Sequence, residues 1–177
     1  NDKVDLGNGL PKYTFGLNLN LGYKGFDLSL NATGAAGFQI AQSYRDPNSS
    51  QSNYSRQILD RWTGEGTSNR IPRVTYGDVG NWQFSDLYLQ DGDYIRLQNI
   101  TLGYDFKRLI SWKGLSKLRL YVQAQNLFTL TKYDGMDPEI GSFNGTDGNN
   151  NDTWVSGVDM GYYPHPRTFI VGINLAF

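Results

Sequence analysis

The side chains best suited to chemistry in this sequence are one histidine and a set of carboxylates. His165 is the only histidine among 177 residues, and cysteine is absent. A nucleophilic triad and a histidine metal cluster both need more such groups than the chain contains. We therefore expect His165 to have a structural role, and we expect no thiol chemistry, no cysteine-ligated zinc and no cofactor.

Carboxylates gather in one polar segment near the end of the chain. They are Asp134, Asp137, Glu139, Asp147, Asp152 and Asp159. Residues 147–158 begin like a calcium-binding loop, but Asp152 stands where such a loop needs glycine and Val158 where it needs glutamate. A solvated loop is therefore favoured over a calcium site. A pair of catalytic carboxylates on regular strands, as in a glycosidase, is disfavoured.

Aromatic side chains in polar segments form a third candidate site. They are Trp62, Trp82, Trp154, Tyr162 and Tyr163. Such rings can stack on sugars, or they can pack within a loop or against a partner protein. The sequence leaves both roles open, with packing favoured.

Composition favours strands and turns over helices. The chain has 21 Gly, 12 Tyr, 9 Phe and 4 Trp, residues typical of strands and tight turns. Its net charge is -1 and it lacks the clustered Lys and Arg that phosphate binding needs, which excludes a nucleic-acid partner. No apolar run reaches the ~20 residues of a membrane helix, whereas the half-apolar strands of a membrane barrel are compatible with this hydropathy.

Five segments alternate between apolar and polar residues, as strands with one apolar face do. They span residues 12–23, 26–37, 93–106, 117–130 and 168–177. A phase shift in the third segment predicts a β-bulge near Gln98 and Asn99. The residues assigned to a lipid-facing surface are Tyr13, Phe15, Leu17, Leu19, Leu21, Leu28, Leu30, Leu118, Leu120, Val122, Val171, Ile173 and Leu175. Those assigned to an aqueous lumen are Asn18, Asn20, Asp27, Asn31, Arg119, Gln123, Gln125 and Asn174.

The polar face distinguishes a membrane barrel from a soluble β-sandwich. It carries Asn, Gln, Gly, Ser and Thr with isolated charges, which suits a barrel lumen, whereas a water-covered sheet usually carries Lys and Glu. Connections between the segments alternate short and long, with long loops at about residues 38–92 and 132–167. The predicted fold class is all-β, with antiparallel strands forming part of a transmembrane β-barrel, and the soluble sandwich is the alternative.

Aromatic residues gather at the segment ends, as in the two interfacial belts of a barrel. The belt at the short-turn end would contain Tyr23, Phe26, Tyr104, Phe106, Trp112 and Phe177. The belt at the long-loop end would contain Tyr13, Phe38, Tyr94, Phe128 and Phe169. Because outer-membrane barrels have their long loops outside the cell, we expect the C-terminus on the periplasmic side.

Several short sequence motifs are distributed along the whole chain. They are LPKYTFGLNL at residues 10–19, DRWT at 60–63, IPR at 71–73, LQDGDYIRLQNITLGY at 89–104, QNLFTLTKY at 125–133, DPE at 137–139 and RTFIVGINLAF at 167–177. Together they resemble the C-terminal part of the SusC/RagA family of TonB-dependent outer-membrane transporters. The resemblance implies the closing strands of a plugged barrel of about 22 strands. We expect the plug domain to lie outside these 177 residues.

The resemblance also implies partners. Such barrels work with a SusD-like surface lipoprotein that covers them, and TonB acts on the plug. Because five strands cannot close a barrel, we expect the remaining strands and the plug in the same polypeptide or in a companion chain. The final strand, which contains Phe169 and Phe177, is similar to the signal that the outer-membrane assembly machinery recognises.

The function that the resemblance implies is import of glycans, oligosaccharides or peptides across the bacterial outer membrane, without enzymatic activity. One alternative is a receptor or adhesin barrel whose loops bind a partner and pass nothing through. The other is a soluble β-sandwich enzyme, which would require water solubility without detergent.

Overall fold

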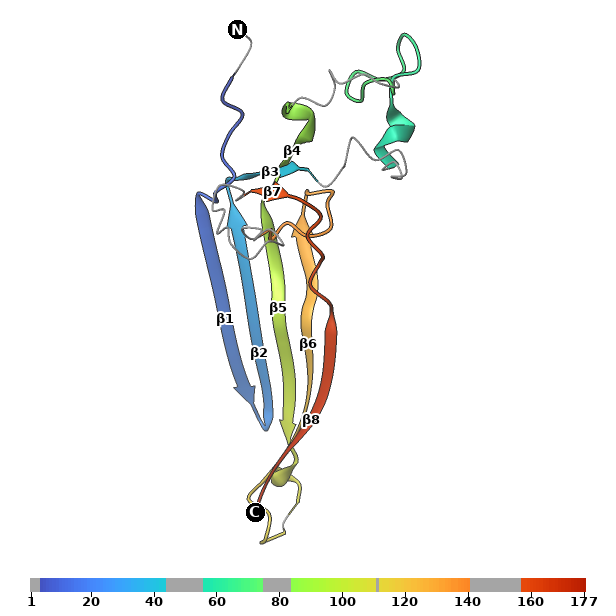
Figure 1. The fold of residues 1–177 in the computed structure, drawn as a ribbon. Coiled ribbons are helices and arrows are strands. Elements are labelled where there is room, and N and C mark those ends of the chain that lie inside the picture. The colour runs from blue at the N-terminus through green and yellow to red at the C-terminus, as the bar shows by residue number, and fades with distance from the viewer. Residues whose placement is uncertain (1–3, 44–55, 75–83, 111, 141–156) are drawn as a thin grey trace, which may run out of the picture.

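The computed structural model describes residues 4–43, 56–74, 84–110, 112–140 and 157–177, and its main feature is a five-stranded sheet. The strands are β1 (Tyr13–Tyr23), β2 (Phe26–Ala36), β5 (Tyr94–Asp105), β6 (Lys117–Thr131) and β8 (Thr168–Ala176). They lie side by side in the order β1-β2-β5-β6-β8, and every neighbouring pair is antiparallel (Figure 1). Each predicted segment corresponds to one of these strands.

Tight local turns explain why the strands reverse at one end of the sheet. Lys24 and Gly25 connect β1 to β2 with φ values of 46° and 94°, the left-handed pair that a type I′ hairpin turn requires. Below β5 the chain makes the short 3-10 helix η4 (Phe106–Arg108), which Asp105 caps by accepting a hydrogen bond from the Lys107 amide at 2.9 Å. This end is called the short-turn end, and the opposite end, from which the long connections leave, the loop end.

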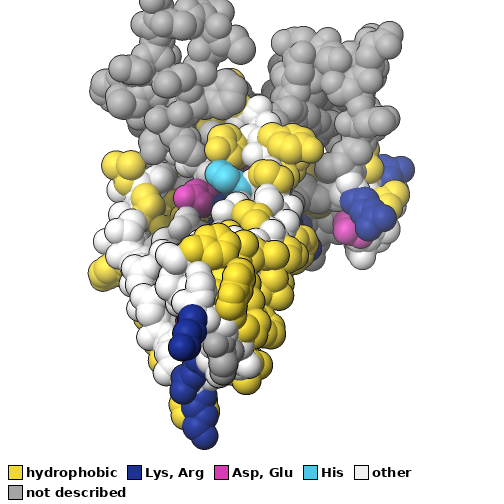
Figure 2. Space-filling view, turned by 90° about the horizontal axis from the view of Figure 1, so that it is seen from below, with side chains coloured by type: hydrophobic (Ala, Val, Ile, Leu, Met, Phe, Trp, Pro, Cys, Tyr) yellow, Lys and Arg dark blue, Asp and Glu magenta, His cyan; other side chains and the backbone are white. Residues whose placement is uncertain are grey.

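The pairing register gives the sheet one apolar and one polar face. Residues directly opposite each other on paired strands share a face, so the row Leu21, Leu28, Leu102, Val122 and Val171 crosses the sheet on one side. All residues in the predicted apolar set lie on this side, and all residues in the predicted polar set lie on the other. Seen from the short-turn end, hydrophobic side chains form a continuous patch along one side of the sheet (Figure 2).

The predicted β-bulge is confirmed at Gln98. Asn31 pairs with Asn99 and Ala32 with Leu97, so Gln98 has no counterpart on β2. The bulge continues into β6, where Asn126 has a φ of 50° and donates through Nδ2 to the carbonyl of Pro166 at 3.1 Å. An extra residue reverses the alternation beyond it, which decides the faces of the residues at the loop end.

A second, small sheet lies across the loop end of the first (Figure 1). It contains β3 (Gln39–Gln42), β4 (Leu89–Asp91) and β7 (Val158–Asp159) in the order β4-β3-β7, with β3 and β7 parallel. Two further 3-10 helices, η1 (Arg56–Asp60) and η3 (Asp86–Tyr88), belong to the first long connection. The two long connections are therefore partly regular, and pairing between them holds their bases together.

The core beneath this small sheet corrects two predicted belt residues. Phe38 is buried with Ala35, Ile40 and Tyr133, and Tyr94 packs against the same cluster. Tyr94 lies beyond the bulge and pairs with Ala35 on the polar face, so neither ring belongs to a surface belt at the loop end. The prediction was wrong for Tyr94 because it rested on the position near a strand end and not on the alternation. With Ile95 and Leu97 on the apolar face before the bulge, Tyr94 falls on the polar face.

The rings at the short-turn end do gather. Tyr104 lies 4.5 Å from Phe26 and 4.9 Å from Phe106, measured between ring centroids. Trp112 and Phe177 form a second edge-to-face pair with centroids 6.3 Å apart. Among the described residues, no helix is long and apolar enough to cross a membrane.

Candidate functional site

The polar face of the five-stranded sheet is lined by hydrogen-bonded amide and hydroxyl side chains. Asn31 donates to Asn18 and Ser29 donates to Asn20, each at 2.6 Å. These pairs sit directly opposite each other on β1 and β2, where cross-strand side chains come into contact. The face is thus polar, and part of its hydrogen bonding is met by cross-strand pairs of uncharged side chains.

An ion pair crosses this face near the short-turn end. Arg119 on β6 reaches over β5 to Asp27 on β2, with its Nε donating to Asp27 Oδ1 at 2.8 Å and its Nη2 forming a second contact with the same carboxylate. Gly103 lies between them, and a Cβ there would collide with both side chains. The glycine therefore leaves the space in which the guanidinium lies flat on the sheet.

A buried charge cluster occupies the same face at the loop end. Arg96 on β5 is 3% exposed and pairs with Asp137 and with Glu139, the latter at 2.8 Å. Its Nε donates to Thr129 Oγ1 at 2.9 Å. His165 Nδ1 lies 3.3 Å from Asp137 Oδ2, so the only histidine of the chain belongs to this cluster.

The carboxylates of this cluster pair with a protein cation. Both carboxylates of the DPE motif face Arg96. No group of three or more His, Cys, Asp or Glu side chains able to hold a metal occurs in the parts of the chain that the structure describes. These ion pairs attach the second long connection to the polar face of the five-stranded sheet.

The pH dependence of the loop end follows from Asp137. Burial by itself raises the pKa of this carboxyl, but hydrogen bonds from the Glu139 amide and the Arg96 guanidinium, with the charge of Arg96, hold the pKa below its ordinary 3.8. A carboxyl with a lowered folded-state pKa stabilises the fold above its unfolded pKa, and this stabilisation is lost as the pH falls through the folded value. We expect the stability that Asp137 contributes to the full-length protein to be lost as the pH falls below about 4.

Asp137→Asn tests this expectation. The variant should be less stable near neutral pH and should lose less stability than the wild type on acidification, because it has no proton to take up at this position. The urea midpoint, followed from neutral to acid pH for both proteins, measures the difference. Parallel curves would contradict the role assigned to Asp137.

Asp159 anchors the small sheet. It is 1% exposed, and its Oδ1 accepts hydrogen bonds from the amides of Gly161 at 2.8 Å and Tyr162 at 3.0 Å. Its Oδ2 accepts from the hydroxyl of Tyr133. Of the six carboxylates noted in the sequence, those of Asp137, Glu139 and Asp159 thus bind protein groups, while Asp147 and Asp152 lie outside the described residues. The sixth residue, Asp134, is held through its backbone amide, which donates to Gln90 Oε1 at 2.8 Å.

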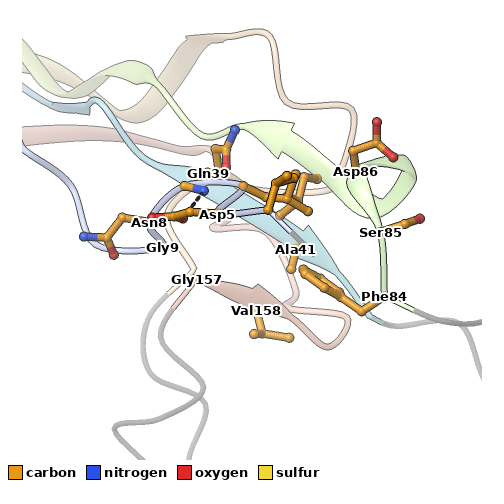
Figure 3. Close-up of a pocket in the computed structure, with 14 residues that line it drawn as sticks. Asp5, Asn8, Gly9, Gln39, Ala41, Phe84, Ser85, Asp86, Gly157 and Val158 are labelled. Atoms are coloured by element: carbon orange, nitrogen blue, oxygen red, sulfur yellow. Dashed lines mark hydrogen bonds between the residues drawn. The ribbon is translucent and has the colours of Figure 1, made fainter. Parts of the chain in front are cut away.

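A cavity of about 740 Å³ opens beside the small sheet. Figure 3 shows Asp5, Asn8 and Gln39 on one side of it and Phe84, Asp86 and Val158 on the other. The Gln39 amide donates to the Asn8 carbonyl at 2.9 Å, which fixes the N-terminal segment against β3. The cavity combines apolar walls with a few polar groups, as ligand sites do.

Three of the predicted aromatic recognition residues lie in the described part of the chain, and their surroundings differ. Trp62 is 39% exposed and lines a shallow groove with Arg70 and Arg73. Tyr162 lies 6.0 Å from the His165 ring, whereas Tyr163 is 82% exposed. The remaining two, Trp82 and Trp154, lie outside the described residues.

The residue that sequence reasoning missed is Arg96. It stands among apolar residues in the third predicted strand, and only the phase shift at Gln98 indicated that its side chain turns to the polar face. An arginine within a strand, combined with an acidic motif elsewhere in the chain, was the available signal.

The sequence of this chain is similar to those of known outer-membrane receptors. No protein-family model matches it. It is 34% identical to the TonB-dependent receptor P3 of Formosa agariphila over 178 residues, which cover 99% of this chain and 17% of the receptor. It is 31% identical to the TonB-dependent receptor SusC of Bacteroides thetaiotaomicron over 167 residues, 92% of this chain and 15% of SusC. The chain thus spans less than a fifth of the length of these curated relatives.

Solved structures of similar fold agree. The RagAB peptide transporter superposes with a TM-score of 0.75 at 24% identity, over 98% of this chain and 18% of that chain. The RagAB peptide importer in its open-open state gives a TM-score of 0.70 over 95% of this chain. These relatives are named as receptors and transporters and not as enzymes. With its antiparallel sheet of one apolar and one polar face, the chain belongs to the SusC/RagA type of TonB-dependent outer-membrane proteins and forms part of their transmembrane β-barrel.

Proposed function

We propose that this chain is the closing wall segment of a barrel that imports glycans, oligosaccharides or peptides across the bacterial outer membrane, together with a SusD-like lipoprotein. The observation that carries the proposal is the apolar face of the five-stranded sheet. Leu17 is 57% exposed and Val171 is 72% exposed, although both lie within regular strands. A continuous apolar face of this size is stable only against lipid or another protein surface.

The opposite face supports a water-filled or plug-filled interior. Asn31 bonds to Asn18 and Ser29 to Asn20 across this face, and uncharged Asn, Ser, Thr and Gln side chains give it a low charge density. In an outer-membrane barrel this face turns to the lumen, where polar side chains meet water, substrate or the plug. We assign the predicted apolar set to lipid and the predicted polar set to the lumen on this basis.

The other proposed partners are the remaining barrel strands, the plug, TonB and the outer-membrane assembly machinery. The sheet has two edge strands, β1 and β8, and an edge in lipid leaves backbone groups unpaired. The remaining barrel strands would pair with these edges, and the plug would connect the barrel to TonB. Phe169 and Phe177, which are 72% and 81% exposed, are the residues proposed for recognition by the assembly machinery.

Transport is tested with the full-length protein in cells. Deletion of its gene should abolish uptake of one class of labelled oligomer, either oligosaccharides or oligopeptides, and the protein purified in detergent should retain a lipoprotein. Binding of the oligomer without uptake would instead favour a receptor or adhesin. Recovery of the protein from the aqueous fraction would contradict the membrane assignment.

The orientation gives a separate prediction. Because these 177 residues contain no cysteine, single cysteines introduced into them can report on each end in a full-length protein from which any other cysteine has been removed. Tyr163→Cys at the loop end should react on intact cells with a maleimide reagent too large for porins. The matched Lys113→Cys in the short turn should react only after the outer membrane is permeabilised, and the reverse pattern would invert the proposed orientation.

A further inference from the structure

Cations gather beside the exposed aromatic rings of the short-turn end. They are Lys24 in the β1–β2 turn and Lys107, Arg108 and Lys113 in the β5–β6 connection. Figure 2, which looks onto this end, shows Lys and Arg side chains at the tip of the sheet. Residues 24–25 and 106–116, which form the two connections, contain no acidic residue.

The carboxylates of Asp27 and Asp105, which flank these connections in the sequence, have other partners. Asp27 pairs with Arg119 on the polar face. Asp105 also lies on the polar face, opposite Arg119, and its carboxylate caps η4. The positive charge of the two connections is therefore not neutralised by an ion pair within the described residues.

Two of the cations lie directly against rings of the apolar face. Lys24 Nζ stands 5.1 Å from the centre of the Tyr23 ring. A Cβ added to Gly25 would meet Arg108 Cδ at 2.9 Å and Tyr104 Cε2 at 3.2 Å, so the stem of Arg108 and the Tyr104 ring lie over the same glycine. The stems of Lys24 and Arg108 thus lie on an apolar surface, and both residues are exposed.

The other two cations flank the second aromatic pair. Lys107 donates through Nζ to the carbonyl of Trp112 at 2.7 Å, and Lys113 follows in the chain as an exposed residue. Trp112 is 60% exposed and contacts the ring of Phe177. Rings of this kind sit at the level of lipid headgroups, with cations beside them reaching the phosphates.

We infer that this end of the sheet binds the headgroups of anionic phospholipids in the leaflet next to the periplasm. Lys24, Arg108 and Lys113 would donate to the headgroup phosphate, while Tyr23, Tyr104 and Trp112 hold the acyl–headgroup boundary. The inference rests on the proposed membrane-spanning function and orientation, because only then do these rings meet the headgroups of that leaflet. It adds a defined lipid class to the partners of the barrel.

The test uses the full-length protein purified from outer membranes in a neutral detergent. Native mass spectrometry measures its binding of phosphatidylglycerol, with phosphatidylethanolamine of the same acyl chains as the zwitterionic comparison. We expect the wild type to prefer phosphatidylglycerol. Lys24→Gln, Arg108→Gln and Lys113→Gln combined should raise the apparent dissociation constant for that lipid about tenfold or more.

Two matched variants separate charge from position and from folding. Lys12→Gln, Lys132→Gln and Arg167→Gln remove the same number of exposed charges at the loop end and should leave the dissociation constant unchanged. Lys24→Arg, Arg108→Lys and Lys113→Arg keep the charges and should keep the preference. If the neutral triple variant does not assemble, Lys113→Gln alone and a salt titration of the wild type test the inference instead. Binding of phosphatidylglycerol at this site must weaken in about 1 M salt.

The inference is overturned by equal affinity of the wild type for both lipids, by an unchanged constant in the neutral short-turn variant, or by salt-insensitive binding. Each of these results would leave a protein that inserts in the outer membrane and imports its substrate. Failure of the proposed function looks different, because the wild type would then be recovered from the aqueous fraction or would show no uptake.

Discussion

Arg96→Met is expected to lower the free energy of unfolding of the full-length protein by about 3 to 5 kcal/mol. The side chain of Asp137 is 4% exposed, so removal of Arg96 leaves a buried carboxylate without its cation. The amides of Glu139 at 2.9 Å and His165 at 3.3 Å still donate to that carboxylate, which places the expected cost in the lower half of the range. Urea unfolding of the refoldable full-length protein measures it.

Arg119→Met is the matched control. Arg119 also pairs with a carboxylate across the polar face, but the side chains of Arg119 and Asp27 are 18% and 39% exposed, and solvent screens such a pair. We expect a loss of about 1 kcal/mol or less. Adding Asp137→Asn to Arg96→Met should restore part of the stability, because the unpaired charge is then gone. Equal losses at both arginines would show that burial of the Arg96 cluster contributes nothing.

Leu30→Arg should cost about 2 to 4 kcal/mol. Leu30 lies near the middle of β2 and pairs with Leu19 on one side and Ile100 on the other, so a charge there would be placed close to the middle of the bilayer. The same substitution near a belt, for example at Leu120 in the row of Phe26 and Tyr104, should cost less because the guanidinium can reach the headgroups.

Ser29→Arg provides the comparison for Leu30→Arg. Ser29 precedes Leu30 in the chain and faces the other side of the sheet, where it pairs with Asn20 and Thr101. An arginine at this position would enter the polar lumen and should change stability by less than about 1 kcal/mol. The amount of heat-modifiable barrel in outer membranes and its urea midpoint report both effects, and similar losses at the two sites would refute the assignment of the faces.

The sequence alone was sufficient to locate the strands of the main sheet. Alternation is a local property with a period of two residues, so the strands containing Leu19, Leu30, Val122 and Ile173 could be located and their faces separated without tertiary information. The hairpin at Lys24 and Gly25 was equally local, because two residues between alternating segments predict a tight turn and glycine readily adopts the left-handed backbone angles of that turn.

Contacts between distant segments could not be derived in this way. β3 and β7 pair through Ala41 with Val158 and Gln42 with Asp159, and no local pattern specifies which distant strand a short segment will join. Likewise Arg119 meets Asp27 across 92 positions of the chain. The second contact exists because the register of the large sheet places β2 and β6 on either side of β5.

Sequence periodicity therefore determined the strands, the two faces and the position of the bulge, and the motifs indicated the family. Tertiary structure decided the consequences of the bulge. Because one extra residue at Gln98 reverses the alternation, Arg96 and Tyr94 turn to the polar face. There Arg96 meets Asp137 and Glu139 from a separate connection. Packing buries Arg96 and Asp137 more deeply than Arg119 and Asp27, and no local pattern encodes that burial.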